Sequence, residues 1–336
     1  LGISAAAIVA LNLRGEDPLP SAETLKLTPA LVAQGEYLTR VGNCMACHTV
    51  QGGAPFAGGR GIETPFGVVY SSNLTPDKAT GLGAWTSAEF WRAMHNGRGK
   101  DGRLLYPAFP YTSYTHVTRE DSDAIFAYLQ SLPPVAQGNK AHALRFPYST
   151  QAALGVWRAL FFTPADAAQP APPAPQALAT AQVPDYQRGA YLVNGLGHCA
   201  ACHTPRNSLG AEQQGQALAG GLIPVQNWLA PALTDAGQAG VQRWPQADVV
   251  ALLKTGVAPQ ASVIGPMAEV VFRSTQYLSD ADARAMAVYL QALPQHAATP
   301  AKQAAAPVSA MERGAKVYEA QCAQCHGAQG PGAGGD

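Results

Sequence analysis

The pattern Cys-x-x-Cys-His occurs three times in the 336-residue chain, and its copies use all six cysteines. The copies read "CMACH" (44–48), "CAACH" (199–203) and "CAQCH" (322–326). A disulfide framework spaces its cysteines variably, and a structural zinc site pairs two Cys-x-x-Cys motifs or joins one to a downstream pair of histidines. Neither arrangement explains a histidine directly after the second cysteine in every copy. The repeated pattern therefore predicts covalent attachment of c-type haem.

Geometry explains why this chemistry needs this spacing. Two thiols three positions apart can join the two vinyl groups of one porphyrin as thioethers, and the adjacent imidazole then ligates the iron. We therefore expect three haems c. The expected attachment residues are Cys44, Cys47, Cys199, Cys202, Cys322 and Cys325. The expected proximal iron ligands are His48, His203 and His326.

The first two motifs belong to two copies of one longer unit. The matching segments lie at the motif, in the middle of the unit and at its end: 35–49 with 189–204, 83–97 with 242–256, and 117–133 with 278–294. Each copy is about 115 residues long, a common domain size. A third copy begins near residue 312, and the sequence stops ten residues after its histidine. We therefore expect an incomplete third domain.

This repeat predicts the organisation of the whole chain. The expected segments are 1–20, the end of a membrane helix or signal segment plus a linker; 21–135, a first domain; 136–180, an aromatic connector and a Pro/Ala linker; 181–296, a second domain; 297–308, a linker; and 309–336, the start of a third domain. Proline- and alanine-rich linkers are extended and semi-rigid.

Each unit is expected to be helical. The first helix contains Gly35 or Gly189, and the missing side chain would let this helix cross closely under the last one. A middle helix begins at Thr86, where Glu89 three residues later completes a capping box. Residues 52–77, between the motif and this helix, are rich in Gly and Pro, and we expect them to be irregular.

The last helix of each unit is expected to begin at Thr118 or Ser279, because an acidic residue follows three positions later in both. Apolar residues then recur at helical spacing until a Leu-Pro pair ends the helix. These patterns together predict a mainly α fold.

One aromatic segment, 143–162, belongs to neither copy. The simpler interpretation is a helix packed on the first domain. The alternative is a docking surface for a partner, because exposed Trp157, Phe161 and Phe162 would otherwise reduce solubility.

The first thirteen residues, "LGISAAAIVALNL", are apolar and uncharged but too few to span a bilayer. They could end a longer membrane helix or a signal peptide, and we favour the membrane helix because no small-x-small cleavage site follows. Covalent haem implies export, which in bacteria means the periplasm. We therefore expect a periplasmic protein anchored to the inner membrane.

Composition narrows the choice of partners. The formal net charge is zero, so no basic surface argues for nucleic acid. Charged residues make up 13%, about half the usual share. Low charge and 47% hydrophobic residues suit a subunit that buries surface against other proteins or lipid.

The chain resembles the three-haem cytochrome c subunits of periplasmic, membrane-bound bacterial dehydrogenases from about residue 28 onward. The segments that carry the resemblance lie outside the haem motifs: "TPFGVVYSSNLTPD" (64–77), "DGRLLYPAFPYTSY" (101–114), "RFPYSTQAALGVWRALFF" (145–162) and "STQYLSDADARAMAVYLQALP" (274–294). This resemblance implies tandem class I-like cytochrome c domains joined by Pro/Ala-rich linkers.

The same resemblance implies an electron-transfer role with no catalysis by the chain alone. The family accepts electrons from a catalytic subunit that is a quinoprotein, a flavoprotein or a molybdenum hydroxylase, in some cases with a small iron–sulfur subunit. It passes them to ubiquinone or another respiratory-chain acceptor. The sequence does not identify the catalytic partner or its substrate.

The resemblance also implies a methionine as second axial ligand of each haem. Met267, in "IGPMAEVV" 64 residues after His203, matches this position in the second domain. A thioether there would raise the reduction potential. The first domain departs from the pattern, because Phe109 stands where the family motif "LYPAMPY" has methionine.

The middle helix, 87–97, offers two replacements, Met94 and His95. Helical periodicity places Met94 on the apolar stripe, while His95 points roughly 100° away and aligns with Lys254, an exposed type of residue. We therefore favour Met94 as the sixth ligand of the first haem, although imidazole binds iron more strongly.

Two other functions stay open. Phe109 would suit a haem enzyme of the di-haem peroxidase or thiosulfate dehydrogenase type, which needs an open iron position. A cytochrome subunit of a terminal oxidase is the third possibility. Carbon monoxide distinguishes the first alternative, because an open haem binds the gas and a six-coordinate one does not.

Overall fold

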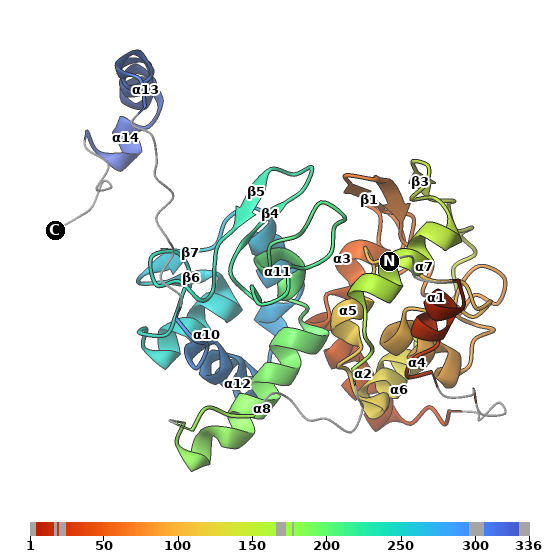
Figure 1. The fold of residues 1–336 in the computed structure, drawn as a ribbon. Coiled ribbons are helices and arrows are strands. Elements are labelled where there is room, and N and C mark those ends of the chain that lie inside the picture. Colours follow the sequence, from red (N-terminus) through yellow and green to blue (C-terminus); the bar gives the residue numbers. More distant parts are fainter. Residues whose placement is uncertain are drawn as a thin grey trace. The chain divides into compact units, whose positions relative to one another are not determined.

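The structure is a computed structural model, and it describes residues 5–16, 19, 25–165, 173–176, 178–295 and 306–328. The side chains of Cys325 and His326 lie outside this description, as do the middle parts of both expected linkers, 166–172 and 296–305. The chain forms two compact units, Leu1–Ala297 and Ala298–Asp336. The larger unit contains the first two haem motifs (Figure 1). Helices dominate both units, so the prediction of a mainly α fold is confirmed.

We use "first domain" for residues 25–135 and "second domain" for residues 183–294. The helices of the first domain are α2 (Pro29–Val41), α3 (Cys44–His48), α4 (Ser87–Asn96), α5 (Tyr111–Tyr114) and α6 (Arg119–Ser131). Those of the second are α8 (Val183–Tyr191), the π-helical turn η2 (Leu192–Leu196), α9 (Ala200–His203), α10 (Gln246–Thr255), α11 (Pro266–Arg273), the 3₁₀ turn η3 (Thr275–Tyr277) and α12 (Asp280–Gln291). A further 3₁₀ turn, η1 (Thr180–Gln182), precedes α8.

The helix starts follow the predicted caps. The Thr86 hydroxyl accepts the backbone N–H of Glu89, and the Glu89 carboxylate accepts the N–H of Thr86. The Thr118 and Ser279 hydroxyls cap α6 and α12 by accepting the backbone N–H of the residue three positions later. Each cap satisfies a backbone donor that the helix itself cannot. The predicted starts of α4, α6 and α12 are therefore confirmed.

The first and last helices of each domain cross at a glycine. A Cβ atom on Gly35 would lie 1.8 Å from the Ala124 carbonyl oxygen, and one on Gly189 would lie 2.0 Å from that of Ala285. No other residue allows the helices to approach so closely. The predicted close crossing is confirmed in both domains, and the buried core begins here, with Leu38, Ile125 and Leu129 in the first domain and Leu192, Met286 and Leu290 in the second.

The second domain carries an additional residue before its motif. Cys44 lies nine positions after Gly35, whereas Cys199 lies ten positions after Gly189. The helix accommodates this residue by widening into the π-helical turn Leu192–Leu196. Such single π turns absorb one-residue insertions and are frequent near functional sites.

The prediction of irregular chain over 52–77 is wrong in part. Strands β1 (Gly61–Thr64) and β2 (Gly67–Tyr70) form an antiparallel hairpin there, and β3 (Ala143–Leu144) adds to its edge. The loop Pro65-Phe66 makes the turn, and Gly67 follows at a φ of 126°. The second domain has smaller hairpins, β4 (Gly221–Ile223) with β5 (Trp228–Ala230) and β6 (Val257–Ala258) with β7 (Ala261–Ser262).

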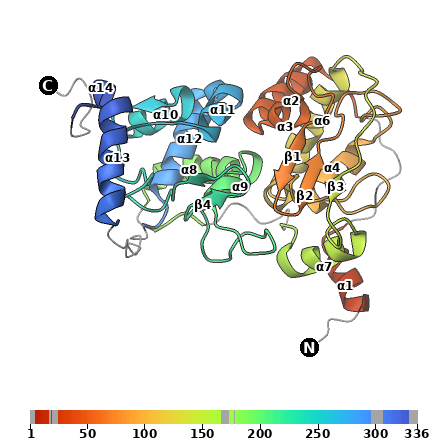
Figure 2. The same cartoon turned by 90° about the horizontal axis from the view of Figure 1, so that it is seen from above.

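The aromatic segment forms α7 (Gln151–Phe161), which packs against α1 (Ala5–Asn12) beside the first domain (Figure 2). Asn12 is buried between them and bonds the Gly155 carbonyl at 2.9 Å and the Arg158 guanidinium at 3.0 Å. Phe162 is buried against Tyr111, with ring centroids 4.9 Å apart. The simpler interpretation, a helix packed on the first domain, is therefore confirmed, and the exposed Phe162 of the docking-surface alternative is not found.

Two other aromatic residues of this segment are partly covered. Trp157 and Phe161 are half-buried, and the Trp157 indole donates to the Leu209 carbonyl at 2.9 Å. Within the described residues, no helix has the length and apolar character needed to cross a bilayer.

The smaller unit contains α13 (Val308–Gln321) and α14 (Ala323–His326). The Tyr318 hydroxyl donates to the Gly327 carbonyl at 2.8 Å and so ties the end of the motif helix to α13.

Candidate haem-binding sites

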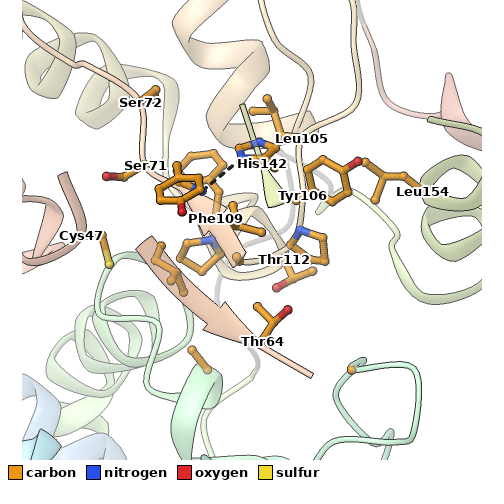
Figure 3. Close-up of a pocket in the computed structure, with 18 of the residues that line it drawn as sticks. Cys47, Thr64, Ser71, Ser72, Leu105, Tyr106, Phe109, Thr112, His142 and Leu154 are labelled. Carbon is orange, nitrogen blue, oxygen red and sulfur yellow. Dashed lines mark hydrogen bonds between the residues drawn. The ribbon is translucent and has the colours of Figure 1, made fainter. Parts of the chain in front are cut away.

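The first motif opens onto a cavity of the larger unit, about 1720 Å³ in volume. Helix α3 presents Cys44, Cys47 and His48 along one wall, and Phe109 lines the cavity as well. Figure 3 labels Cys47, Ser72 and Phe109 around this space. The cavity is lined mainly by apolar side chains, which suits a porphyrin.

The His48 ring is held in one orientation by the backbone. Its Nδ1 lies 2.7 Å from the Ser72 carbonyl oxygen, and since a carbonyl can only accept, Nδ1 carries the proton. This tautomer leaves the lone pair on Nε2, which is the nitrogen that can then ligate iron. Burial lowers the pKa of His48, and the bond to Ser72 opposes this. The ring is thus held as a neutral base with a free ligating nitrogen.

The second motif repeats this arrangement with different residues. His203 Nδ1 lies 2.7 Å from the Pro231 carbonyl oxygen, so Nε2 of this ring is again the ligating nitrogen. Burial lowers its pKa too, against the bond to Pro231. Both sites therefore fit a haem whose iron is held by the motif histidine.

Neither carbonyl is among the site residues predicted from the sequence. Ser72 directly precedes "NLT" (73–75), and Pro231 directly precedes "ALT" (232–234). The shared Leu-Thr pair marks the equivalent turn in the two repeats. An alignment of the repeats through this stretch is the signal that identifies both carbonyls.

An arginine lies against each attachment motif. Arg60 donates to the Ala46 carbonyl, and Arg206 donates to the Ala201 carbonyl at 3.0 Å. These two alanines occupy the same position within their motifs. Arg60 also pairs with Glu269 of the second domain at 3.3 Å.

The two arginines act on the second thiol of each motif. Burial raises the pKa of Cys47 and of Cys202, while Arg60 and Arg206 respectively lower it. A positive charge beside each attachment loop favours the thiolate, the form in which a cysteine reacts.

The structure separates the two candidate sixth ligands of the first haem. Met94 is 4% exposed and lines the cavity, whereas His95 is not among the described lining residues. His95 stacks on Trp91, with ring centroids 4.5 Å apart, and is 5% exposed. The expectation that His95 faces outward is therefore wrong, because the indole covers it.

The remaining predicted residues are only partly described. Met267 is half-buried in the first turn of α11, after Gly265 at a φ of 55° and Pro266. Among the predicted site residues of the third motif, only Cys322 has a described side chain, and it is half-buried. All five cysteines with described side chains are free of disulfide bonds.

Two protein-family models match the chain. The family described as "Cytochrome c" matches residues 32–133 and 186–294. The family described as "Cytochrome C oxidase, cbb3-type, subunit III" matches residues 309–336.

Curated relatives match most of the chain. It is 39% identical to the "Alcohol dehydrogenase (quinone), cytochrome c subunit" of Gluconacetobacter polyoxogenes, over 93% of this chain and 68% of the relative. It is 40% identical to the "Gluconate 2-dehydrogenase cytochrome c subunit" of Pantoea cypripedii, over 90% and 70% respectively. It is 42% identical to a nicotinate dehydrogenase subunit of Pseudomonas putida, over 88% of this chain and 24% of the relative. The chain therefore belongs to the cytochrome c family, among the cytochrome c subunits of dehydrogenases, and is built from tandem cytochrome c domains that bind haem c.

Proposed function

We propose that the chain carries electrons from the catalytic subunit of a periplasmic dehydrogenase toward the respiratory chain. The observation that supports this best is the matched pair of histidines, each with Nδ1 bound to a carbonyl and Nε2 left for iron. Bound haem c supplies one-electron exchange at its iron. The protein fixes the ligand tautomer and provides an apolar wall around the first site.

The haem count is three in this proposal. The haems are attached at Cys44 and Cys47, at Cys199 and Cys202, and at Cys322 and Cys325. Their proximal ligands are His48, His203 and His326. The sixth ligands are Met267 in the second domain and Met94 in the first. The domains are class I-like, and the stretches 163–182 and 295–309 are Pro/Ala-rich linkers.

The proposed partners follow from the family resemblance and from the predicted compartment. The electron donor is a quinoprotein, flavoprotein or molybdenum hydroxylase subunit, in some complexes with a small iron–sulfur subunit. The acceptor is ubiquinone or another cytochrome. The complex is anchored at the periplasmic face of the inner membrane. Reduction of the purified cytochrome by its co-purified catalytic subunit and substrate tests this role directly.

The cofactor assignment has its own test. Denatured protein should retain haem, and mass spectrometry should find one adduct for each motif. Replacing Cys199 and Cys202 with alanine should remove one adduct and leave the others. Extraction of the haem by acid acetone would refute covalent attachment, since thioethers survive that treatment.

The sixth ligand of the first haem decides between a carrier and an enzyme. Met94→Ala should lower the potential of that haem and change its electron paramagnetic resonance signal, whereas His95→Ala should leave both unchanged. If neither variant has an effect and the reduced protein binds carbon monoxide readily, the peroxidase-like alternative is favoured. Phe109, which lines the cavity in place of the family's methionine, is the observation behind that alternative.

A further inference from the structure

Two hydrogen bonds join the first and second domains in a reciprocal manner. The Tyr37 hydroxyl of the first domain donates to Asp282 Oδ2 of the second at 2.6 Å. The Tyr191 hydroxyl of the second domain donates to Asp121 Oδ2 of the first, also at 2.6 Å. We call these two bonds the tyrosine interlock. Because each acceptor is a carboxylate, both bonds are of the strong, charge-assisted kind.

The four residues occupy equivalent positions in the repeat. Each tyrosine lies two positions after the crossing glycine, Gly35 or Gly189. Each aspartate lies three positions after the residue that caps the last helix. The interface is therefore of the isologous kind, in which one surface meets its own equivalent about a two-fold axis.

The surrounding contacts follow the same symmetry. The backbone N–H of Ser279 donates to the Tyr37 hydroxyl oxygen at 3.2 Å, and that of Thr118 donates to the Tyr191 hydroxyl oxygen at 3.3 Å. Helix α2 of the first domain packs against η3 of the second. In the second domain η2, which continues the first helix α8, packs against α5 of the first. Each pair joins the first-helix region of one domain to the short turn before the last helix of the other.

The third repeat lacks the tyrosine. Lys316 stands two positions after Gly314, where the first two copies have Tyr37 and Tyr191. A lysine cannot reproduce a short hydroxyl–carboxylate bond capped by a backbone N–H. The interlock is thus specific to the first two domains.

The interlock lies on the helices that lead into the haem motifs. Tyr37 precedes Cys44 by seven positions, and Tyr191 precedes Cys199 by eight. His198, directly before the second motif, and Ala201 within it also line the cavity of the first motif. A shift between the domains would therefore change the separation of the two attachment sites.

We propose that Tyr37 and Tyr191, through Asp282 and Asp121, are positioning residues that hold the first two domains as one body and set the separation of their haems. This rests on the proposed electron-transfer function. Electron exchange between the two haems should then depend on hydroxyl groups that touch neither of them.

The double variant Tyr37→Phe/Tyr191→Phe removes both hydroxyls and keeps both rings. Each loss should shift the closed-to-open equilibrium of the pair about tenfold toward open, the effect of a hydrogen bond to a charged group. We expect slower electron equilibration between the two haems after pulsed reduction and a larger radius of gyration by X-ray scattering. Haem content and the spectrum of each haem should not change.

Tyr289→Phe is the matched control. The Tyr289 hydroxyl accepts from Asn194 Nδ2 at 2.9 Å, and both residues belong to the second domain. This variant loses a tyrosine hydroxyl bond within one domain, so exchange between haems should stay at the wild-type rate. If the double variant does not fold, the two single variants test the same point, since each keeps one bond.

Unchanged scattering and unchanged equilibration in the double variant would overturn the interlock while leaving the proposed function intact. Loss of haem or of reduction by the dehydrogenase in the wild-type chain would instead overturn the proposed function. Slower equilibration in both the double variant and the control would show a general loss of stability and would also overturn the interlock.

Discussion

Replacing Gly35 with alanine should destabilise the first domain, although helix propensity alone predicts the opposite. Alanine is favoured over glycine in a helix interior by about 1 kcal/mol. The new Cβ, however, would lie 1.8 Å from the Ala124 carbonyl oxygen, 2.5 Å from its carbon and 2.9 Å from Tyr128 Cβ. Two of these atoms are backbone, so no rotamer change can relieve the contact.

The magnitude follows from how far the helices must move. Non-bonded heavy atoms prefer separations of about 3.5–4.0 Å, so α2 and α6 would have to part by well over about 1 Å. Overpacking costs about 1–3 kcal/mol and more where backbone must shift. We expect a net loss of about 3 kcal/mol, or about 10 °C in the melting temperature of a domain of this size.

Gly155→Ala is the matched control, because Gly155 is also helical but has room. Its Cβ would lie 3.7 Å from Leu104 Cδ1, an ordinary van der Waals contact. This variant should be neutral or more stable by up to about 1 kcal/mol. Thermal unfolding of both holoproteins, followed by circular dichroism, gives the comparison. A Gly35→Ala protein that melts at or above the wild-type temperature would refute the close crossing.

Three further predictions follow from single side chains. Met267→Ala should keep its haem attached but lower that haem's potential, and an unchanged redox titration would assign Met267 to packing. Burial raises the pKa of Asp282, but hydrogen bonds led by Arg188 outweigh it and hold the pKa below its ordinary value. The ionised Asp282 therefore stabilises the fold fully above about pH 4, and this contribution is lost as the pH falls through the native pKa. Asp282→Asn should make the free energy of unfolding fall less steeply with acidification. An equally steep fall would contradict this. Glu16→Gln breaks the 2.5 Å ion pair between Glu16 and Arg98, two side chains that are 12% and 15% exposed respectively. The free energy of unfolding in denaturant should fall by about 2 kcal/mol, which is less than the loss of a fully buried pair costs. A cost near zero would show that water already screens the pair.

Local signals in the sequence predict much of the fold. The caps at Thr86, Thr118 and Ser279 depend only on neighbouring residues, and the structure has all three. The crossing glycines are also readable, because two repeats of one unit place them identically. The hairpin around Gly67 is missed, since its strands are short and Gly and Pro dominate the composition there.

The parts that the sequence does not predict depend on distant contacts. His95 is covered by Trp91 on its own helix, and periodicity alone places it outward. The sequence favours a helix packed on the first domain, but it does not predict the contact that buries Phe162 against Tyr111, about fifty positions earlier. The carbonyls that orient His48 and His203 come from loops, and in the sequence only the alignment of the two repeats at their shared Leu-Thr pair points to them.

The π-helical turn Leu192–Leu196 makes the two-fold pair unequal. The tyrosine interlock treats the two domains alike, but the connection from tyrosine to cysteine is longer in the second. His198 stands there at a φ of 39°, where the first domain has Asn43 at 52°. Two identical haem sites would have equal potentials, and an electron would rest on either with equal chance. The inserted residue gives the second attachment site surroundings that the first lacks, and the surroundings of a haem help to set its potential. In the proposed electron-transfer role the insertion therefore adds to the difference in potential between the two sites, beside the different positions of the proposed sixth ligands Met94 and Met267.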